Sequence, residues 1–301
     1  MSLQRFIPYS VAMVTPFTKA GNLDVANVSA VVKYYLDQNI PGLLVSGTTG
    51  EQHCMTIAER KELYRLVAET TAGTGCQLYA GVAAFKTEDA KELAVAAKEI
   101  GFNGIMLGFP PYRIISQYEA EIYVKEVAST VKELPIFLYN NPRRNGFNVE
   151  PETFARIANT VKNVYGQKET GAVENVNKMK SLLLNQVQQQ EVDGYSFFSG
   201  TDSKFIDAYV KHGYTGITSI AGNVYPNEIK AIVDNLQKNQ VEEAESIMTS
   251  ISVGVELLEQ AGMIQAIKYL LRKKLVPIGY SPPPVLDLSD EMKQSLDKIF
   301  L

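Results

Sequence analysis

Short, strongly apolar runs alternate along this 301-residue chain with longer amphipathic segments. The apolar runs are rich in Val, Ile, Leu, Phe and Tyr and lack a regular polar alternation, which is typical of buried parallel strands. We expect eight of these runs to be strands: Ser10–Pro16, Gly42–Gly47, Gln77–Ala83, Gly104–Phe109, Pro135–Asn140, Val164–Lys168, Tyr195–Gly200 and Gly216–Ile220.

The segments between these runs carry helix-start signals. Thr56–Glu59 and Ser116–Glu119 have the pattern of capping boxes, and Pro151 suits a first helical position. Asp202 is expected to cap the helix that carries Phe205. Eight alternating strand–helix units indicate a parallel sheet, and with eight units we favour a closed (β/α)8 TIM barrel over an open, doubly wound sheet.

The domain plan follows from the length of such a barrel. A (β/α)8 barrel uses roughly 250 residues as one domain. We predict the barrel over residues 1–237, with its eighth helix beginning at Pro226. Residues 238–301 are then a C-terminal helical extension packed on the barrel, with a role in packing or in contacts between subunits.

Composition excludes several classes of protein. A net charge of −4 and a pI of about 5.5 argue against a nucleic-acid binder. No apolar run reaches the roughly 18 residues of a membrane-spanning helix, and the N-terminus lacks the apolar core of a signal peptide, so we expect a cytoplasmic protein. Two histidines and two isolated cysteines predict neither a metal site nor a disulfide framework. Walker A, GxGxxG and GxSxG motifs are absent from the sequence.

Lys168 is the most informative residue at the predicted strand ends, where barrel enzymes place their active sites. It lies in an apolar strand with glycines on either side. Burial lowers the pKa of a lysine, and a neutral amine can attack a carbonyl group to form a Schiff base. The alternative is a lysine at the barrel mouth that is solvated or paired with Glu169.

Other strand ends carry polar side chains suited to a small acid. The hydroxyl and N–H groups of Thr48 and Thr49 could bind a carboxylate, or they could form a plain turn that Glu51 braces. Tyr139 could transfer protons, or it could be one more core tyrosine. Arg144 could pair with a substrate carboxylate, or it could be an exposed loop arginine.

Together these strand ends resemble the dihydrodipicolinate synthase / N-acetylneuraminate lyase family of class I, Schiff-base aldolases. The resemblance runs in order from about Ile7 to Val233. It rests on VAMVTPF at Val11–Phe17, GTTGE at Gly47–Glu51, LYNxPxRxG at Leu138–Gly146, GQKETG at Gly166–Gly171, and the strand ends at 200–202 and 216–223.

The resemblance implies a role for each matching residue. Lys168 would form the Schiff base with the keto carbon of pyruvate or a pyruvate-derived acid, and Tyr139 would shuttle protons. Thr49 would hydrogen-bond Tyr139, and with Thr48 would hold the pyruvate carboxylate. Thr218 would line the pyruvate pocket. Because the lysine is itself the covalent catalyst, the resemblance implies no cofactor and no metal.

Two residues favour the synthase branch, which condenses pyruvate with aspartate semialdehyde on the route to lysine. Thr48 stands where the lyase branch usually has Ser, and Arg144 matches the arginine that receives the second substrate's carboxylate. Arg113 departs from the pattern, because it stands where the family has an aromatic residue that a partner subunit contributes across a tight dimer interface. Gln167 replaces an aliphatic residue, and Gln52 with His53 replaces small or apolar ones.

Three functions remain open on these residues. The chain is a synthase-type enzyme, another pyruvate-dependent aldolase or lyase acting on a 2-keto-3-deoxy or related sugar acid, or a non-catalytic homologue that binds a keto acid. The substrates expected of an enzyme are pyruvate and an aldehyde co-substrate. The resemblance also implies a homo-oligomer, a dimer or a tetramer.

Overall fold

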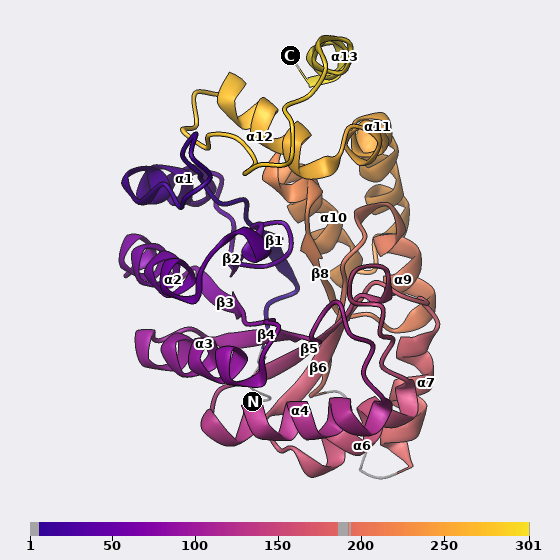
Figure 1. Cartoon of the computed structure of the whole chain (residues 1–301). Coiled ribbons are helices and arrows are strands. Elements are labelled where there is room, and N and C mark those ends of the chain that lie inside the picture. Colours follow the sequence, from indigo (N-terminus) through magenta and orange to yellow (C-terminus); the bar gives the residue numbers. More distant parts are fainter. Residues whose placement is uncertain (1–5, 186–191, 193, 301) are drawn as a thin grey trace. The chain divides into compact units, whose positions relative to one another are not determined.

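The structure, a computed structural model, describes residues 6–185, 192 and 194–300. This range leaves out residues 1–5, where no signal peptide is expected. It also leaves out the outer limits of the two predicted domains, at residues 1 and 301. Eight parallel strands form a closed barrel in sequence order, which confirms the predicted fold (Figure 1). The strands are β1 Tyr9–Ala12, β2 Gly42–Val45, β3 Gln77–Gly81, β4 Gly104–Gly108, β5 Ile136–Asn140, β6 Val164–Glu169, β7 Ser196–Ser199 and β8 Gly216–Ser219.

Helices follow the strands as the alternation predicts. Each predicted apolar run overlaps one observed strand, and the largest difference is at β1, where buried residues continue beyond the paired segment. The helices are α1 Val25–Asp37, α2 Ile57–Thr71, α3 Thr87–Ile100, α4 Gln117–Thr130, α5 Pro142–Asn145, α6 Pro151–Thr160, α7 Asn175–Leu184, α9 Phe205–His212, α10 Pro226–Gln237, α11 Val241–Gln260, α12 Met263–Lys273 and α13 Asp290–Phe300. Three short 3₁₀ helices are η1 Gln52–Cys54, η2 Asp202–Lys204 and η3 Ala221–Asn223.

Residue contacts divide the chain into two compact units. The first unit comprises the segment up to Pro8 together with 77–218. Its strands pair in parallel from β3 to β8, with Lys168 of β6 in register with Tyr139 of β5 and Phe198 of β7. Because side chains alternate along a strand, these three residues share one face, while Asn140 and Glu169 lie on the other.

An aromatic layer fills the face of the sheet that carries Lys168. The ring of Phe6 lies 3.8 Å from that of Phe198, 4.0 Å from Tyr79 and 4.8 Å from Phe137, measured between centroids. All four residues are at most 2% exposed. This layer excludes water from the sheet on the side where the lysine sits.

Helix starts in this unit follow the predicted signals with one exception. The capping box at Ser116 starts α4, and Pro151 is the first residue of α6. These two helices lie side by side on the outer face (Figure 1). The predicted cap at Asp202 is wrong, because η2 intervenes and α9 begins at Phe205, one residue after its N-cap, Lys204.

The second unit comprises Tyr9–Cys76 and the chain from Ser219 onward. The predicted capping box at Thr56 starts α2, which packs against α1. Helices α11, α12 and α13 pack on one another and form the predicted C-terminal helices (Figure 1). The loop between α12 and α13 is tied to the segment after β1 by a bridge between Gly279 and Phe17.

The predicted domain boundary at residue 237 coincides with the end of α10, and the division into two domains there stays a prediction. Within the described residues, no helix combines the length and apolarity needed to cross a membrane. The cytoplasmic location also stays a prediction.

Candidate active site

Lys168 is a buried amine on the inner face of β6. The residue is 2% exposed, and burial lowers the pKa of its amine. The charges of Tyr139 and Asp202 oppose this shift, while the Arg144 guanidinium adds to it. Its Nζ lies 4.8 Å from the centroid of the Tyr139 ring. Glu169, the alternative partner, faces the other side of the sheet, so the amine is buried where a neutral nucleophile is favoured.

Tyr139 lies near the end of β5 beside Lys168, and its hydroxyl has a defined partner. The Asn141 amide Nδ2 donates a hydrogen bond to the Tyr139 hydroxyl oxygen at 2.6 Å. Because this bond uses an oxygen lone pair, the phenolic proton remains available for donation. Asn141 is not among the residues predicted from the sequence, although an amide two residues past the tyrosine at a strand end is a signal for such a contact.

The end of β7 contributes two further residues to which the sequence-based prediction gave no role in the site. Asp202 is 2% exposed, and its charge acts on the Lys168 amine. Gly200 leaves room for the lysine: a Cβ at this position would lie 2.6 Å from Lys168 Cε and 2.3 Å from Thr170 Cγ2. The glycine directly after the apolar run was the available sequence signal.

Arg144 lies on α5, a single helical turn that follows β5. Its backbone N–H donates to the Asn141 carbonyl at 3.0 Å, and its side chain is exposed. The guanidinium is close enough to Lys168 to lower the pKa of that amine. Arg143, its neighbour, is also exposed. The exposed Arg144 is accessible to a substrate anion.

A buried polar network lies on the opposite face of β6. Burial raises the pKa of the Glu169 carboxyl to about 7, against the effect of hydrogen bonds from the Gly171 N–H and from the side-chain amides of Asn140, Gln167 and Asn175. The Asn140 Nδ2 donates to the carboxylate at 2.9 Å and the Gln167 Nε2 at 2.8 Å. Gln167 Oε1 is buried without a hydrogen-bond partner in the described part of the chain. The departure at Gln167 therefore belongs to a network behind the lysine.

Thr48 and Thr49 lie in the second unit, on the turn after β2. Thr49 is 4% exposed and Thr48 is half-buried. Glu51 closes this turn and forms an ion pair with the buried Lys268 of α12. The bracing role considered for Glu51 stays a prediction. The carboxylate-binding roles of the two threonines, and the hydrogen bond from Thr49 to Tyr139, stay predictions.

Thr218 and Arg113 lie near the ends of two other strands, β8 and β4. Thr218 is fully buried near the end of β8, and its role in a pyruvate pocket stays a prediction. Arg113 lies in the exposed loop after β4, next to Tyr112, which is 97% exposed and has a φ of 79°. A positive φ is rare for a bulky residue, so this loop presents an aromatic side chain from a strained backbone.

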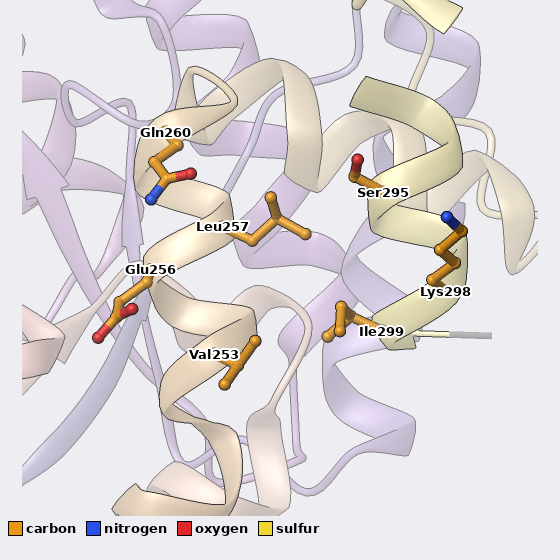
Figure 2. A pocket seen from close by; sticks show the side chains of 7 residues that line it. All are labelled: Val253, Glu256, Leu257, Gln260, Ser295, Lys298 and Ile299. Carbon is orange, nitrogen blue, oxygen red and sulfur yellow. The ribbon is translucent and has the colours of Figure 1, made fainter. Parts of the chain in front are cut away.

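The described residues contain no group of three or more His, Cys, Asp or Glu side chains arranged to hold a metal ion. A groove of about 330 Å³ lies elsewhere in the second unit, between α11 and α13 (Figure 2). Apolar side chains line it together with one acid, one lysine and two uncharged polar groups: Val253, Glu256, Leu257, Gln260, Ser295, Lys298 and Ile299. The glutamate and the lysine lie on opposite helices in Figure 2, and the groove lacks the buried amine that distinguishes β6.

Comparison with known proteins points to one family. Residues 5–300 match the Dihydrodipicolinate synthetase family. A 4-hydroxy-tetrahydrodipicolinate synthase from Alkaliphilus oremlandii is 32% identical over 248 residues, which cover 82% of this chain and 81% of the relative. The enzyme of that name from Oceanobacillus iheyensis is 28% identical over 288 residues, covering 96% and 94% of the two chains.

Solved structures agree with this match. The dihydrodipicolinate synthase from Cyanidioschyzon merolae with lysine bound has a TM-score of 0.89 at 25% identity, covering 98% of this chain and 97% of that one. The N-acetylneuraminate lyase from Mycoplasma synoviae has a TM-score of 0.85 at 27% identity, with coverage of 98% and 97%. The predicted membership and enzyme class are confirmed: this chain belongs to the dihydrodipicolinate synthetase family of class I aldolases and lyases.

Proposed function

We propose that this chain is a 4-hydroxy-tetrahydrodipicolinate synthase that condenses pyruvate with aspartate semialdehyde through an imine on Lys168. The observation that carries the proposal is the buried Lys168 amine with its lowered pKa, 4.8 Å from the Tyr139 ring and in the field of Asp202. The names of the relatives from Alkaliphilus and Oceanobacillus support the choice of substrates.

The first half of the reaction uses the groups around Lys168. The neutral amine attacks the keto carbon of pyruvate, and the carbonyl oxygen takes a proton as its double bond opens. Loss of that oxygen as water, with the amine's own proton, gives the imine. Tyr139 gives and takes these protons. The hydrogen bond from Asn141 supports this role, because it uses a lone pair of the Tyr139 oxygen and leaves the phenolic proton free.

The second half forms the carbon–carbon bond. Removal of a methyl proton converts the imine to an enamine, whose terminal carbon attacks the aldehyde carbon. The aldehyde oxygen takes a proton and becomes a hydroxyl group. The amino group of aspartate semialdehyde then attacks the imine carbon, which closes a ring and releases the Lys168 amine. The exposed Arg144 guanidinium binds the carboxylate of this second substrate.

Borohydride trapping tests the covalent step. Pyruvate plus borohydride should add a reduced pyruvyl group to Lys168, detected by peptide mass mapping. Lys168→Arg should abolish the labelling, while Lys204→Arg, at an exposed lysine of the same unit, should leave it unchanged. Labelling spread over surface lysines, or its absence with pyruvate, would overturn the assignment of Lys168.

The second substrate is tested with a panel of aldehydes and keto acids followed by identification of the product. Aspartate semialdehyde should be consumed with pyruvate. The likeness to an N-acetylneuraminate lyase keeps sugar-acid substrates as the competing outcome. Turnover of a 2-keto-3-deoxy sugar acid in place of aspartate semialdehyde would assign the chain to that activity.

We also propose that the protein is a homo-oligomer. The loop after β4 and the start of α4 expose three large apolar side chains, Tyr112 at 97%, Ile114 at 70% and Tyr118 at 70%. Because a solvated surface seldom carries so much apolar area in one segment, contact with a second copy explains it. Light scattering should show at least a dimer at micromolar concentration, and a monomer would contradict the proposal. A structural relative described as a monomeric dihydrodipicolinate synthase variant shows that this outcome is a real alternative.

A further inference from the structure

A buried ion pair joins the C-terminal helix α12 to the turn after β2. Lys268 is 0% exposed and Glu51 is 3% exposed, and both belong to the second unit. Lys268 Nζ also donates to the Tyr280 carbonyl at 3.1 Å and lies 4.7 Å from the centroid of the Phe17 ring. Because two charges lose their hydration on burial, such a pair persists only where its geometry and its other contacts are well defined.

The acid of this pair closes the GTTGE turn. Glu51 has φ 53° and ψ 42°, the left-handed region that non-glycine residues seldom adopt. Its N–H donates to the Thr48 carbonyl at 3.0 Å, and the next N–H, of Gln52, donates to the Gly47 carbonyl at 3.3 Å. Holding the Glu51 carboxylate therefore holds the backbone that carries Thr48.

A second buried cation holds the start of the same turn. Arg60 is 3% exposed, and its Nε donates to Ser46 Oγ at 2.9 Å while its Nη2 donates to Gln52 Oε1 at 3.1 Å. Gly50 packs closely against the segment after β1: a Cβ at this position would lie 3.0 Å from Thr15 Oγ1. The turn is thus fixed at both ends and along one side before any ligand arrives.

We propose that Lys268 and Glu51 are positioning residues for the keto acid. Their ion pair fixes the turn in the geometry in which Thr48 and Thr49 hold the substrate carboxylate, so the C-terminal extension is part of the scaffold of the active site. This inference rests on the proposed pyruvate-dependent function and on the carboxylate-binding role of the two threonines.

The pairing of Lys268 with Glu51 leaves no net charge next to the site of the substrate carboxylate. A lone Glu51 carboxylate beneath the turn would repel the carboxylate of the keto acid, and a lone Lys268 would compete for it. Removal of one partner also leaves an uncompensated buried charge, which destabilises the fold. The double variant Glu51→Gln/Lys268→Met removes both charges at nearly constant volume and should keep the fold.

The experiment measures borohydride trapping of pyruvate on Lys168 as a function of pyruvate concentration. In Lys268→Met and in the double variant, half-maximal trapping should need roughly 10- to 100-fold more pyruvate, the effect expected when a binding group is misplaced. The maximal trapping rate at saturating pyruvate should change much less. A loss of fold would instead lower the amplitude of trapping and leave the half-saturating concentration unchanged.

Lys273→Met is the matched control. Lys273 lies on the same helix and pairs with Asp297 of α13 at 3.0 Å, away from the turn. Its half-saturating pyruvate concentration should equal that of the wild type. An equal shift in Lys273→Met and Lys268→Met, or no shift in the folded double variant, would overturn the inference.

Hydrogen exchange of the wild-type protein tests, without any substitution, whether the turn after β2 is rigid before pyruvate binds. The amides of Glu51 and Gln52, which are hydrogen-bonded across the turn, should exchange slowly without pyruvate, because the turn is held in advance, and fast exchange of both would overturn the inference. Failure of the wild type to trap pyruvate would overturn the proposed function, and this inference with it. Normal trapping by the wild type beside unshifted variants would overturn the inference alone.

Discussion

Replacing Glu169 by Gln should change how the stability of the protein depends on pH. Burial raises the pKa of this carboxyl from 4.5 to about 7 in the folded protein. A difference of 2.5 between the folded and unfolded pKa corresponds to about 3 kcal/mol at 1.36 kcal/mol for each pKa unit. Since Glu169 is only 3% exposed, solvent screening does not reduce this figure much.

The sign of the effect follows from proton binding. Between pH 4.5 and 7 the folded state holds a proton on Glu169 that the unfolded state has released. The free energy of unfolding therefore falls as pH rises through this window. About 2.5 kcal/mol of the loss should occur between pH 5 and pH 8. A glutamine side chain does not titrate, so the Glu169→Gln variant should lack this part of the pH dependence.

The network around Glu169 should accept the substitution. Asn140 Nδ2 and the Gly171 N–H can still donate to an amide oxygen at position 169. The new NH₂ group faces Gln167, whose Oε1 is buried without a partner in the described part of the chain. Rotation of the Gln167 amide would offer that oxygen as an acceptor, so the two glutamine amides can hydrogen-bond each other.

Urea unfolding at pH 5 and pH 8, at fixed protein concentration, measures the effect. The stability of wild type relative to Glu169→Gln should decrease by about 2.5 kcal/mol between the two pH values. Glu133→Gln, at a carboxylate 89% exposed in the same unit, is the control and should follow the wild type. Parallel pH profiles for wild type and Glu169→Gln would refute the reasoning.

Three further changes probe separate parts of the first unit. Arg144→Leu should still trap pyruvate on Lys168 but lose roughly 10–100-fold in kcat/KM for an acidic aldehyde, because a charge-assisted contact is worth about 1.5–3 kcal/mol. Arg143→Leu should lose much less, and equal losses would contradict the assignment. Gly200→Ala places a Cβ 2.6 Å from Lys168 Cε, so trapping should slow by roughly tenfold. An unchanged trapping rate would show that the lysine side chain can avoid the added methyl group. Phe6→Ala removes the ring that contacts three other buried rings, so the free energy of unfolding in urea should fall by about 3–5 kcal/mol. A fall below about 1 kcal/mol would show that the aromatic layer does not stabilise the fold.

The architecture and the family of this protein follow from its sequence alone. Short apolar runs without polar alternation, separated by amphipathic helices, are typical of buried strands, so the order of elements followed from local chemistry. The capping boxes at Thr56 and Ser116 are also local, since each needs only residues three apart. Motifs such as GTTGE and GQKETG are contiguous, so they too can be recognised in the linear sequence.

Which neighbours act on these residues depends on the tertiary structure. The field of Asp202 at Lys168 and the space that Gly200 leaves depend on how the strand ends are brought together. The cap expected at Asp202 failed because a 3₁₀ turn, which local pattern does not distinguish, precedes α9.

The ion pair between Glu51 and Lys268 was the least predictable contact from sequence. The two residues are more than 200 positions apart, and nothing in either local pattern marks the other as its partner. A lysine on an amphipathic helix is ordinarily a solvated residue. Folding places this one against the turn after β2, and burial then makes the ion pair necessary, because a lone charge there would lack both water and a counterion.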